Sequence, residues 1–148
     1  IEGAQQHCMN ENVPVARLIL KGISRIGRPL EDINTSIENA GKLEVYKLEK
    51  NISVLATISG VAPMLGFLGT VIGMILSIFE ISNAGGNIDM QLLSNGLYTA
   101  MTTTVAGLIV GICGYISYNH LVVKINKVVY QMESSTLDFL DLLNEPAE

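Results

Sequence analysis

The stretch "APMLGFLGTVIGM", Ala62–Met74, has the hydropathy of a membrane span and the composition of a packing surface. It contains no charged residue, yet it carries a proline and three glycines, which weaken a helix. A segment that only anchored a protein would use leucine instead. The stretch lies inside a longer run, 52–79, that also has no Asp, Glu, Lys or Arg. Roughly 20 apolar residues suffice to cross a bilayer, so this run predicts a transmembrane helix.

A second run without Asp, Glu, Lys or Arg extends over 90–123, and we place a second transmembrane helix at 90–120. Between the two runs lies "EISNAGGNID", Glu80–Asp89, whose Gly and Asn residues indicate a loop. The chain is 49% hydrophobic and 16% charged, and this low charge is typical of a membrane protein. The predicted fold class is an all-α integral membrane protein, a transmembrane helical hairpin with long helices extending into the cytoplasm.

The cations predict the orientation of this hairpin. None of the nine Lys and Arg residues lies in the 80–89 loop, which carries only Glu80 and Asp89 as charged groups. Seven of them precede the first span, and Lys124 and Lys127 follow the second. By the positive-inside rule, both ends of the chain are cytoplasmic and the loop is on the other side of the membrane.

Amphipathic patterns continue the helices beyond the membrane, into cytoplasmic helical regions at 1–51 and 121–148. The second span should run on as one helix from about 90 to 144, and a helix starting near 30 should run into the first span. A shorter helix is predicted over 13–26, before Pro29. The apolar positions on the two long helices fall near helical spacing: Leu30, Ile33, Ile37, Ala40, Leu48 and Ile52; Ile125, Val128, Met132, Phe139 and Leu142. These stripes need partners, from the same chain or from neighbouring copies.

Glycines recur at intervals of three and four in both spans. They are Gly66, Gly69 and Gly73 in the first span and Gly107, Gly111 and Gly114 in the second. Because hydrophobic force between helices is weak in lipid, small residues that allow close packing take its place. We expect these residues to pack helices. Packing of the hairpin on itself accounts for some of them, and two such faces suggest further neighbours.

Hydroxyl side chains form a second pattern. Pro63, Thr70 and Ser77 are seven residues apart and share one stripe, and Ala100 and Thr104 share a stripe with the glycines of the second span. A single threonine in a span usually bonds its own backbone, whereas stripes on both helices are typical of bundle interiors or water-filled paths. Neither span has a carboxylate to carry an ion. If the chain conducts ions, the titrating carboxylate must come from another polypeptide.

Two segments resemble a known family. "LATISGVAPMLGFLGTVIGM", Leu55–Met74, is similar to the second transmembrane helix of the ExbB/TolQ/MotA proton-channel family. "GLYTAMTTTVAGLIVGICGYISYN", Gly96–Asn119, is similar to its third, and the ExbB/TolQ branch fits better than the MotA branch. The resemblance implies that a first transmembrane helix precedes Ile1. It also implies a homopentamer in the bacterial inner membrane, with the hairpin loop in the periplasm.

The resemblance also implies a function and partners. The second and third helices would line a pore around an ExbD/TolR-like subunit whose aspartate carries the ion. The proton motive force would become mechanical work on a periplasm-spanning protein of the TonB or TolA kind, for outer-membrane transport or integrity. Membrane lipids surround such an assembly. The transported proton is the expected ion, and no cofactor is expected.

The family's pore threonines correspond to Thr70, in "GTV", and Thr104, in "TTTVAG", and its helix-breaking proline corresponds to Pro63. Two positions depart from the pattern. Thr99 stands where the family has a glutamate, so any role of that glutamate is absent or moved. Thr103 stands where proton-using members have a small apolar residue. Because hard cations take oxygen ligands, this added hydroxyl keeps a sodium-driven member open as an alternative.

Other functional classes have less support in the sequence. A non-conducting membrane scaffold would need only the glycines and the amphipathic ends. We expect no enzyme, because no nucleophile–base pair, metal cluster or phosphate loop is recognisable. His7 and Cys8 are adjacent but make a poor metal site. The net charge of −5 offers no concentrated basic face for nucleic acid.

Overall fold

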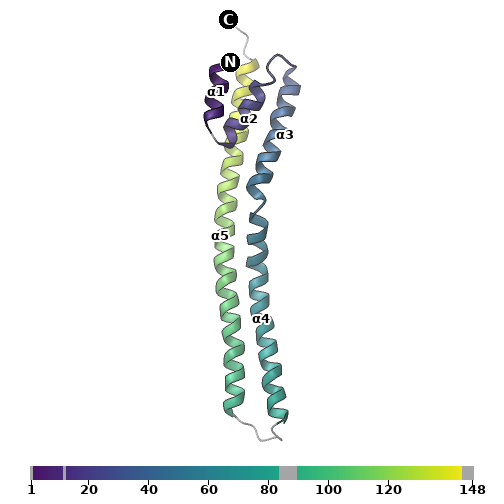
Figure 1. Ribbon diagram of the computed structural model, residues 1–148, viewed down its shortest axis with the longest axis vertical. Coiled ribbons are helices and arrows are strands. Elements are labelled where there is room, and N and C mark those ends of the chain that lie inside the picture. The colour runs from purple at the N-terminus through teal and green to yellow at the C-terminus, as the bar shows by residue number, and fades with distance from the viewer. Residues whose placement is uncertain (1, 12, 84–89, 145–148) are drawn as a thin grey trace. The chain divides into compact units, whose positions relative to one another are not determined.

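The computed structural model describes residues 2–11, 13–83 and 90–144, and the regular structure in these ranges is helical throughout. Its helices are α1 (Glu2–Asn10), α2 (Pro14–Ile23), α3 (Leu30–Glu49), α4 (Ile52–Asn83) and α5 (Met90–Asn144) (Figure 1). They form two compact units, one of residues 1–51 and 121–148 and one of residues 52–120, and α5 contributes to both. The all-α fold predicted from the sequence is confirmed.

The unit of residues 52–120 is a helical hairpin. α4 and the first part of α5 lie side by side and run in opposite directions (Figure 1). Both helices are long and apolar enough to span a membrane. Only 11% and 17% of their most apolar stretches is buried inside the chain, whereas the core helix of a soluble protein is mostly buried. The chain is therefore an all-α membrane protein. The predicted start of the 80–89 loop was wrong, because α4 continues through residues 80–83, and residues 84–89 lie outside the described part.

The long helix predicted over 90–144 is present as α5. The helix predicted from about 30 into the first span is interrupted, because α3 ends at Glu49 and α4 begins at Ile52. Lys50 keeps helical dihedrals and its N–H bonds to the Tyr46 carbonyl, so the interruption is narrow. Asn51 lies at this point, and Asn favours helix ends because its side chain competes for backbone groups.

The N-terminal region differs more from expectation. α2 ends at Ile23 rather than near 26, and the chain turns through Gly27, whose φ of 97° suits glycine. Pro29 then precedes α3, as expected for a helix start. α1 was not predicted, because its sequence is polar and lacks an apolar stripe. It packs on α2 and has no buried residue of its own.

The core of the unit of residues 1–51 and 121–148 is apolar. Leu18 of α2, Ile33 and Ile37 of α3, and Met132 of α5 are buried together. Val128 and Phe139 pack against this cluster, as the predicted stripe on α5 requires. Burial of such side chains stabilises a fold by about 1.5–3 kcal/mol each.

Two positions of the predicted stripes face solvent instead, since Leu30 is 42% and Leu142 68% exposed. Each lies near a helix end, one at the first residue of α3 and the other two residues before the end of α5. Helix ends fray and extend past their neighbours, so periodicity alone overestimates their burial.

Glu44 is the buried carboxylate among the residues described in this unit. Its Oε2 accepts a hydrogen bond from Arg17 of α2 at 2.6 Å, and its Oε1 accepts one from Lys47 at 2.7 Å. These bonds hold the pKa of Glu44 below its ordinary value, with the Arg17 bond as the larger cause and the Lys47 bond as the second. The Arg17–Glu44 pair joins α2 to α3.

We predict that acid loosens α2. The pKa of Glu44 is lower in the folded state than in the unfolded state, so ionised Glu44 stabilises the packing of α2 fully above the unfolded-state pKa of about 4.3. This stabilisation is lost as the pH falls through the folded-state pKa. Glu44→Gln should lower the free energy of opening of α2 by about 1 kcal/mol at pH 7, since both cations are partly exposed. Hydrogen exchange of α2 amides, corrected for intrinsic rates between pH 7 and 3, measures this.

Glu38→Gln is the matched control, because Glu38 is exposed and its bond among the described residues is to Asn34 of its own helix. It should leave α2 exchange unchanged, and the Glu44→Gln variant should lose the acid dependence. Equal exchange in the two variants would contradict the role given to Glu44.

Candidate functional site

The candidate site is the face along which α4 and α5 meet, and its centre is a backbone contact between two glycines. A Cβ on Gly107 would lie 2.7 Å from the Ala62 carbonyl oxygen and 2.8 Å from Cα of Gly66. A Cβ on Gly66 would lie 3.1 Å from Cα of Gly107. A side chain on Gly107 would force backbone atoms of α4 to shift, and one on Gly66 would press tightly against α5, so the two glycines set how closely the spans approach.

The other predicted packing glycines lie along the same face. A Cβ on Gly69 would meet the Thr103 side chain, and one on Gly73 would lie 2.9 Å from Cβ of Ala100. On α5, Gly111 faces Pro63 and Gly114 faces Ser59. Both glycine rows therefore pack within the hairpin of this chain, each against small or hydroxyl residues and proline of the other helix, and Gly66 and Gly107 are the glycines that meet.

Pro63 removes a backbone donor where the helices touch. A proline has no N–H, so the Ser59 carbonyl four residues earlier loses its usual helical partner. A Cβ on Gly111 would lie 2.8 Å from Cδ of Pro63 and 3.2 Å from the Ser59 carbonyl oxygen. The proline ring and this carbonyl are therefore directed at α5, next to a glycine that leaves room for both.

Two threonine hydroxyls converge on one carbonyl at the glycine contact. Thr104 of α5 donates to the Gly66 carbonyl of α4 at 3.1 Å. Thr103 donates to the Ala100 carbonyl at 2.7 Å, and its oxygen lies 3.5 Å from the same Gly66 carbonyl. Since a hydroxyl has one proton, the Ala100 bond is the main one for Thr103. The result is a cluster of oxygen atoms between two spans.

The remaining predicted site residues fall into two groups, those that pack against α5 and those that bond only within their own helix. Ser77 is buried, donates to the Gly73 carbonyl at 2.9 Å, and fills the space beside Gly96 of α5. Thr70 donates to the Phe67 carbonyl of its own helix. The structure thus brings Pro63 and Ser77 of the predicted stripe against α5, and pore lining by this stripe stays a prediction. Thr99 is exposed and bonds to the Asn95 carbonyl of its own helix.

Sequence reasoning did not select Gly96, although it contacts Ser77. A usable signal existed, because Gly96 lies four residues before Ala100 and so extends the small-residue row of α5 by one turn. The predicted 90–120 range also ends on an imidazole, His120, which is exposed. Among the described residues, no group of three or more His, Cys, Asp or Glu side chains could hold a metal ion.

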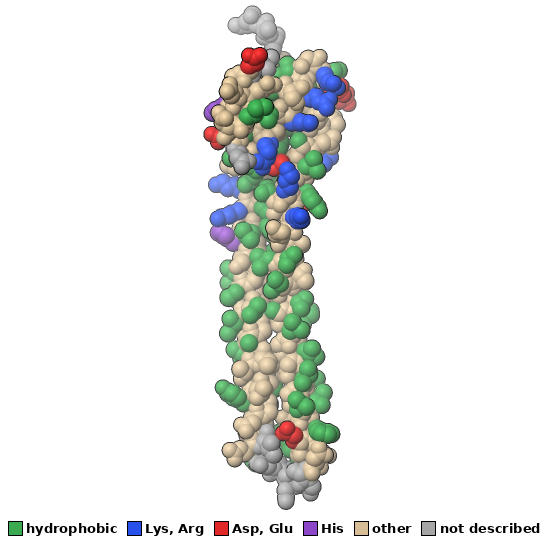
Figure 2. Space-filling model, viewed as in Figure 1, with side chains coloured by type: hydrophobic (Ala, Val, Ile, Leu, Met, Phe, Trp, Pro, Cys, Tyr) green, Lys and Arg blue, Asp and Glu red, His purple; other side chains and the backbone are tan. Residues whose placement is uncertain are grey.

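Apolar side chains cover the outward surface of this hairpin (Figure 2). Met64, Phe67, Ile75, Val105 and Ile112 are each at least half exposed. Lipid or further helices suit such a surface, whereas water does not.

We predict that the stability of the hairpin depends on the close contact at Gly107. Gly107→Ala should destabilise the protein by about 1–3 kcal/mol, because the new methyl meets backbone atoms that cannot move aside. The melting temperature in detergent, followed by circular dichroism, measures the effect.

Gly60→Ala is the control, since a Cβ on Gly60 meets nothing within 4 Å. It should be neutral or stabilising, because Ala favours the helix over Gly by about 1 kcal/mol. A similar loss of melting temperature in both variants would disprove the special role of the contact.

The sequence matches known proteins over most of its length. The profile of the MotA/TolQ/ExbB proton channel family matches residues 10–134. Biopolymer transport protein ExbB of Aquifex aeolicus is 36% identical over 111 residues, 74% of either chain. A homologue of ExbB in Methanothermobacter thermautotrophicus is 29% identical over 120 residues, 81% of this chain and 42% of that one.

The Tol-Pal system protein TolQ of Haemophilus influenzae is 28% identical over 104 residues, which cover 70% of this chain and 45% of TolQ. The chain thus spans less than half the length of the Methanothermobacter relative and of TolQ, and about three quarters of the Aquifex protein. With the glycine-packed hairpin and the family match over 10–134, the chain belongs to the MotA/TolQ/ExbB proton channel family, in its ExbB/TolQ branch.

Proposed function

We propose that this chain is the pore-forming, stator-like subunit of an ion-driven motor in the bacterial inner membrane. The observation that carries the proposal is the α4–α5 face, where hydroxyls and backbone carbonyls are the polar groups and 52–79 and 90–119 hold no ionisable Asp, Glu, Lys, Arg or His. Ion pathways in membranes usually need such a carrier. A second polypeptide with a membrane carboxylate, of the ExbD/TolR kind, therefore completes the site.

The oligomer proposed is a homopentamer around that partner. The outward surfaces of α4 and α5 support an assembly larger than one hairpin, because large apolar side chains are exposed there on both helices. Neighbouring copies and membrane lipids each cover part of this surface. The number five comes from the family resemblance.

The proposed orientation places 1–51 and 121–148 in the cytoplasm and the 80–89 loop in the periplasm. The complete absence of Lys and Arg from that loop supports it. Proton flow would drive work on a TonB- or TolA-type protein, in keeping with relatives called biopolymer transport and Tol-Pal system proteins.

A sodium-driven version is the alternative that a specific observation favours. The hydroxyls of Thr103 and Thr104 and the Gly66 carbonyl place three oxygen atoms together at the α4–α5 contact. Sodium, like other hard cations, is bound by oxygen ligands. A non-conducting scaffold would use the glycine contact alone.

We predict that the Thr104 hydroxyl is needed for ion flow and not for assembly. Thr104→Val keeps the side-chain shape and removes the donor to Gly66, so ion uptake into liposomes that hold the full protein and its small partner should fall at least ten-fold. Native mass measurement should show the same oligomer. Thr70→Ala should behave in the same way, as the family resemblance implies.

Thr102→Val is the matched control, because Thr102 is exposed and bonds the Tyr98 carbonyl of its own helix. Its uptake should stay at the unsubstituted level. Full ion uptake by a Thr70→Ala, Thr104→Ala double variant would refute the proposed ion pathway. If the unsubstituted complex shows no ion uptake, the non-conducting scaffold is favoured.

We further predict that the proton is the transported ion. Uptake driven by a membrane potential at fixed pH should be unchanged when sodium replaces potassium, and it should respond to an imposed pH gradient. Dependence on sodium, reduced by Thr103→Ala, would instead establish the sodium-driven alternative.

A further inference from the structure

Exposed lysines lie in the unit of residues 1–51 and 121–148, close to the points where the chain enters the two spans. Lys50 follows the last residue of α3 and lies two residues before α4. Lys124 and Lys127 lie on α5, four and seven residues beyond the predicted end of the second span at 120. All three side chains are exposed. They are therefore free to meet a ligand at the membrane surface.

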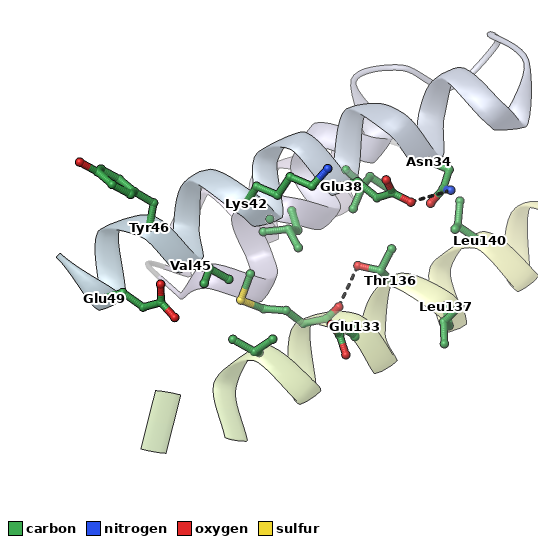
Figure 3. Close-up of a pocket in the computed structure, with 15 residues that line it drawn as sticks. Asn34, Glu38, Lys42, Val45, Tyr46, Glu49, Glu133, Thr136, Leu137 and Leu140 are labelled. Carbon is green, nitrogen blue, oxygen red and sulfur yellow. Dashed lines mark hydrogen bonds between the residues drawn. The ribbon is translucent and has the colours of Figure 1, made fainter. Parts of the chain in front are cut away.

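The segments of α3 and α5 that carry these lysines are neighbours. Both helices line one groove of this unit. Figure 3 shows Asn34 and Leu140 together at one end of the groove and Glu49 at the other. The two helices are therefore antiparallel, so Val129, the first groove residue of α5, lies near Glu49. The three lysines adjoin these two residues in the sequence, and they share this end of the unit.

Positive charge is in excess around the three lysines on these helices. Along α5 no Asp or Glu occurs between the second span and Glu133, which lies six residues beyond Lys127. In the last turn of α3, Glu49 is the one carboxylate. The salt bridges among the described residues use Arg17 and Lys47 as their cations, so the three ammonium groups take no part in them. An anion is needed to balance this charge.

Each lysine of α5 stands next to an exposed apolar side chain on the side of the span. Leu121 lies one turn before Lys124 and is 41% exposed, and Val123 lies one turn before Lys127 and is 68% exposed. Residues three and four apart are neighbours on a helix surface. Leading away from the span, apolar side chains therefore come first and ammonium groups next, which is the order of acyl chains and phosphate in a phospholipid.

The lysines also lie at the depth of lipid headgroups, whose layer is about 5–8 Å thick on each side of the hydrocarbon core. At 1.5 Å per residue, Lys124 lies about 6 Å and Lys127 about 10 Å beyond the second span, and Lys50 lies about 3 Å before α4. Helical side chains lean toward the N-terminus of their helix. This lean brings the ammonium groups of α5 back toward the membrane and carries that of Lys50 away from it. All three converge on the headgroup layer.

We propose that Lys50, Lys124 and Lys127 bind the phosphate group of an anionic phospholipid. Its acyl chains cover the exposed Leu121 and Val123. Lysine binds phosphate as a point charge, and a zwitterionic headgroup would bring a cation of its own to a surface that already has an excess of them. Lysines close to an anionic membrane surface each add to the attraction. The inference rests on the membrane spans and goes beyond the proposed ion conduction.

Lipid titration of the full protein in a neutral detergent, followed by native mass measurement, tests the site. Phosphatidylglycerol should bind at least five-fold more tightly than phosphatidylcholine with the same acyl chains. Lys124→Gln with Lys127→Gln should weaken phosphatidylglycerol binding at least five-fold, because two of the three charges are lost. Lys124→Arg with Lys127→Arg should retain binding, since arginine keeps the charge.

Lys21→Gln with Arg28→Gln is the matched control, because it removes two exposed cations from the other end of the unit. Arg28 lies two residues before the 20-residue helix α3, whose far end is Glu49. A Cβ on Gly22, next to Lys21, would meet Phe139, which is twelve residues beyond Lys127 on α5. Phosphatidylglycerol binding should stay at the unsubstituted level. Equal weakening in the two double variants would reduce the effect to general charge attraction and overturn the site.

Equal binding of the two lipids by the unsubstituted protein would also overturn the proposal. Displacement of phosphatidylglycerol by millimolar inorganic phosphate would do so too, because the lysines would then recognise free phosphate rather than a lipid. Lys50→Gln alone should weaken binding at least two-fold, and it keeps the test decisive if the double variant melts at a lower temperature. The titration measures binding and not ion uptake, so its failure would leave the proposed function standing.

Discussion

The close approach of Gly66 and Gly107 is the contact on which the membrane hairpin depends. Lipid is as apolar as a leucine side chain, so two spans gain little by hiding apolar surface from it. Close packing and hydrogen bonds between helices must supply the attraction. The missing Cβ atoms of these glycines permit both, since backbones meet there and Thr104 reaches the Gly66 carbonyl. Pro63 and Ser77 then pack along the same face.

The unit of residues 1–51 and 121–148 is stabilised by different forces. There the hydrophobic effect operates, and Leu18, Ile37 and Met132 form a core of the ordinary kind. The charge of Glu44 is buried, and its two hydrogen-bonded cations compensate for the loss of water. α5 supplies residues to both units, so one continuous helix serves two environments.

The chemistry of the two spans fits an ion site that is shared between this chain and a second polypeptide. A face of hydroxyls and carbonyls can hydrogen-bond a carboxylate or hold a cation, but it cannot titrate near neutral pH. The chain is therefore suited to surround an ion carrier rather than to be one. This division agrees with membership of a proton channel family and with the absence of carboxylates from 52–79 and 90–120.

Much of this architecture follows from local sequence. Charge-free runs identify both spans, and unbroken amphipathic spacing predicts the helix from 90 to 144, because these properties depend on one segment and its solvent. Spacing also identifies Ile33, Ile37 and Met132 as core residues.

Other features required the packed structure. Small residues look alike whether they meet their own hairpin or another copy, so the pairing of Gly66 with Gly107 is invisible in the sequence. A hydroxyl can bond its own turn, as Thr70 does, or cross to another helix, as Thr104 does. The Arg17–Glu44 bond joins residues 27 positions apart. Periodicity establishes which face of a helix is special, but the choice of neighbour depends on contacts between distant segments, and these exist only after folding.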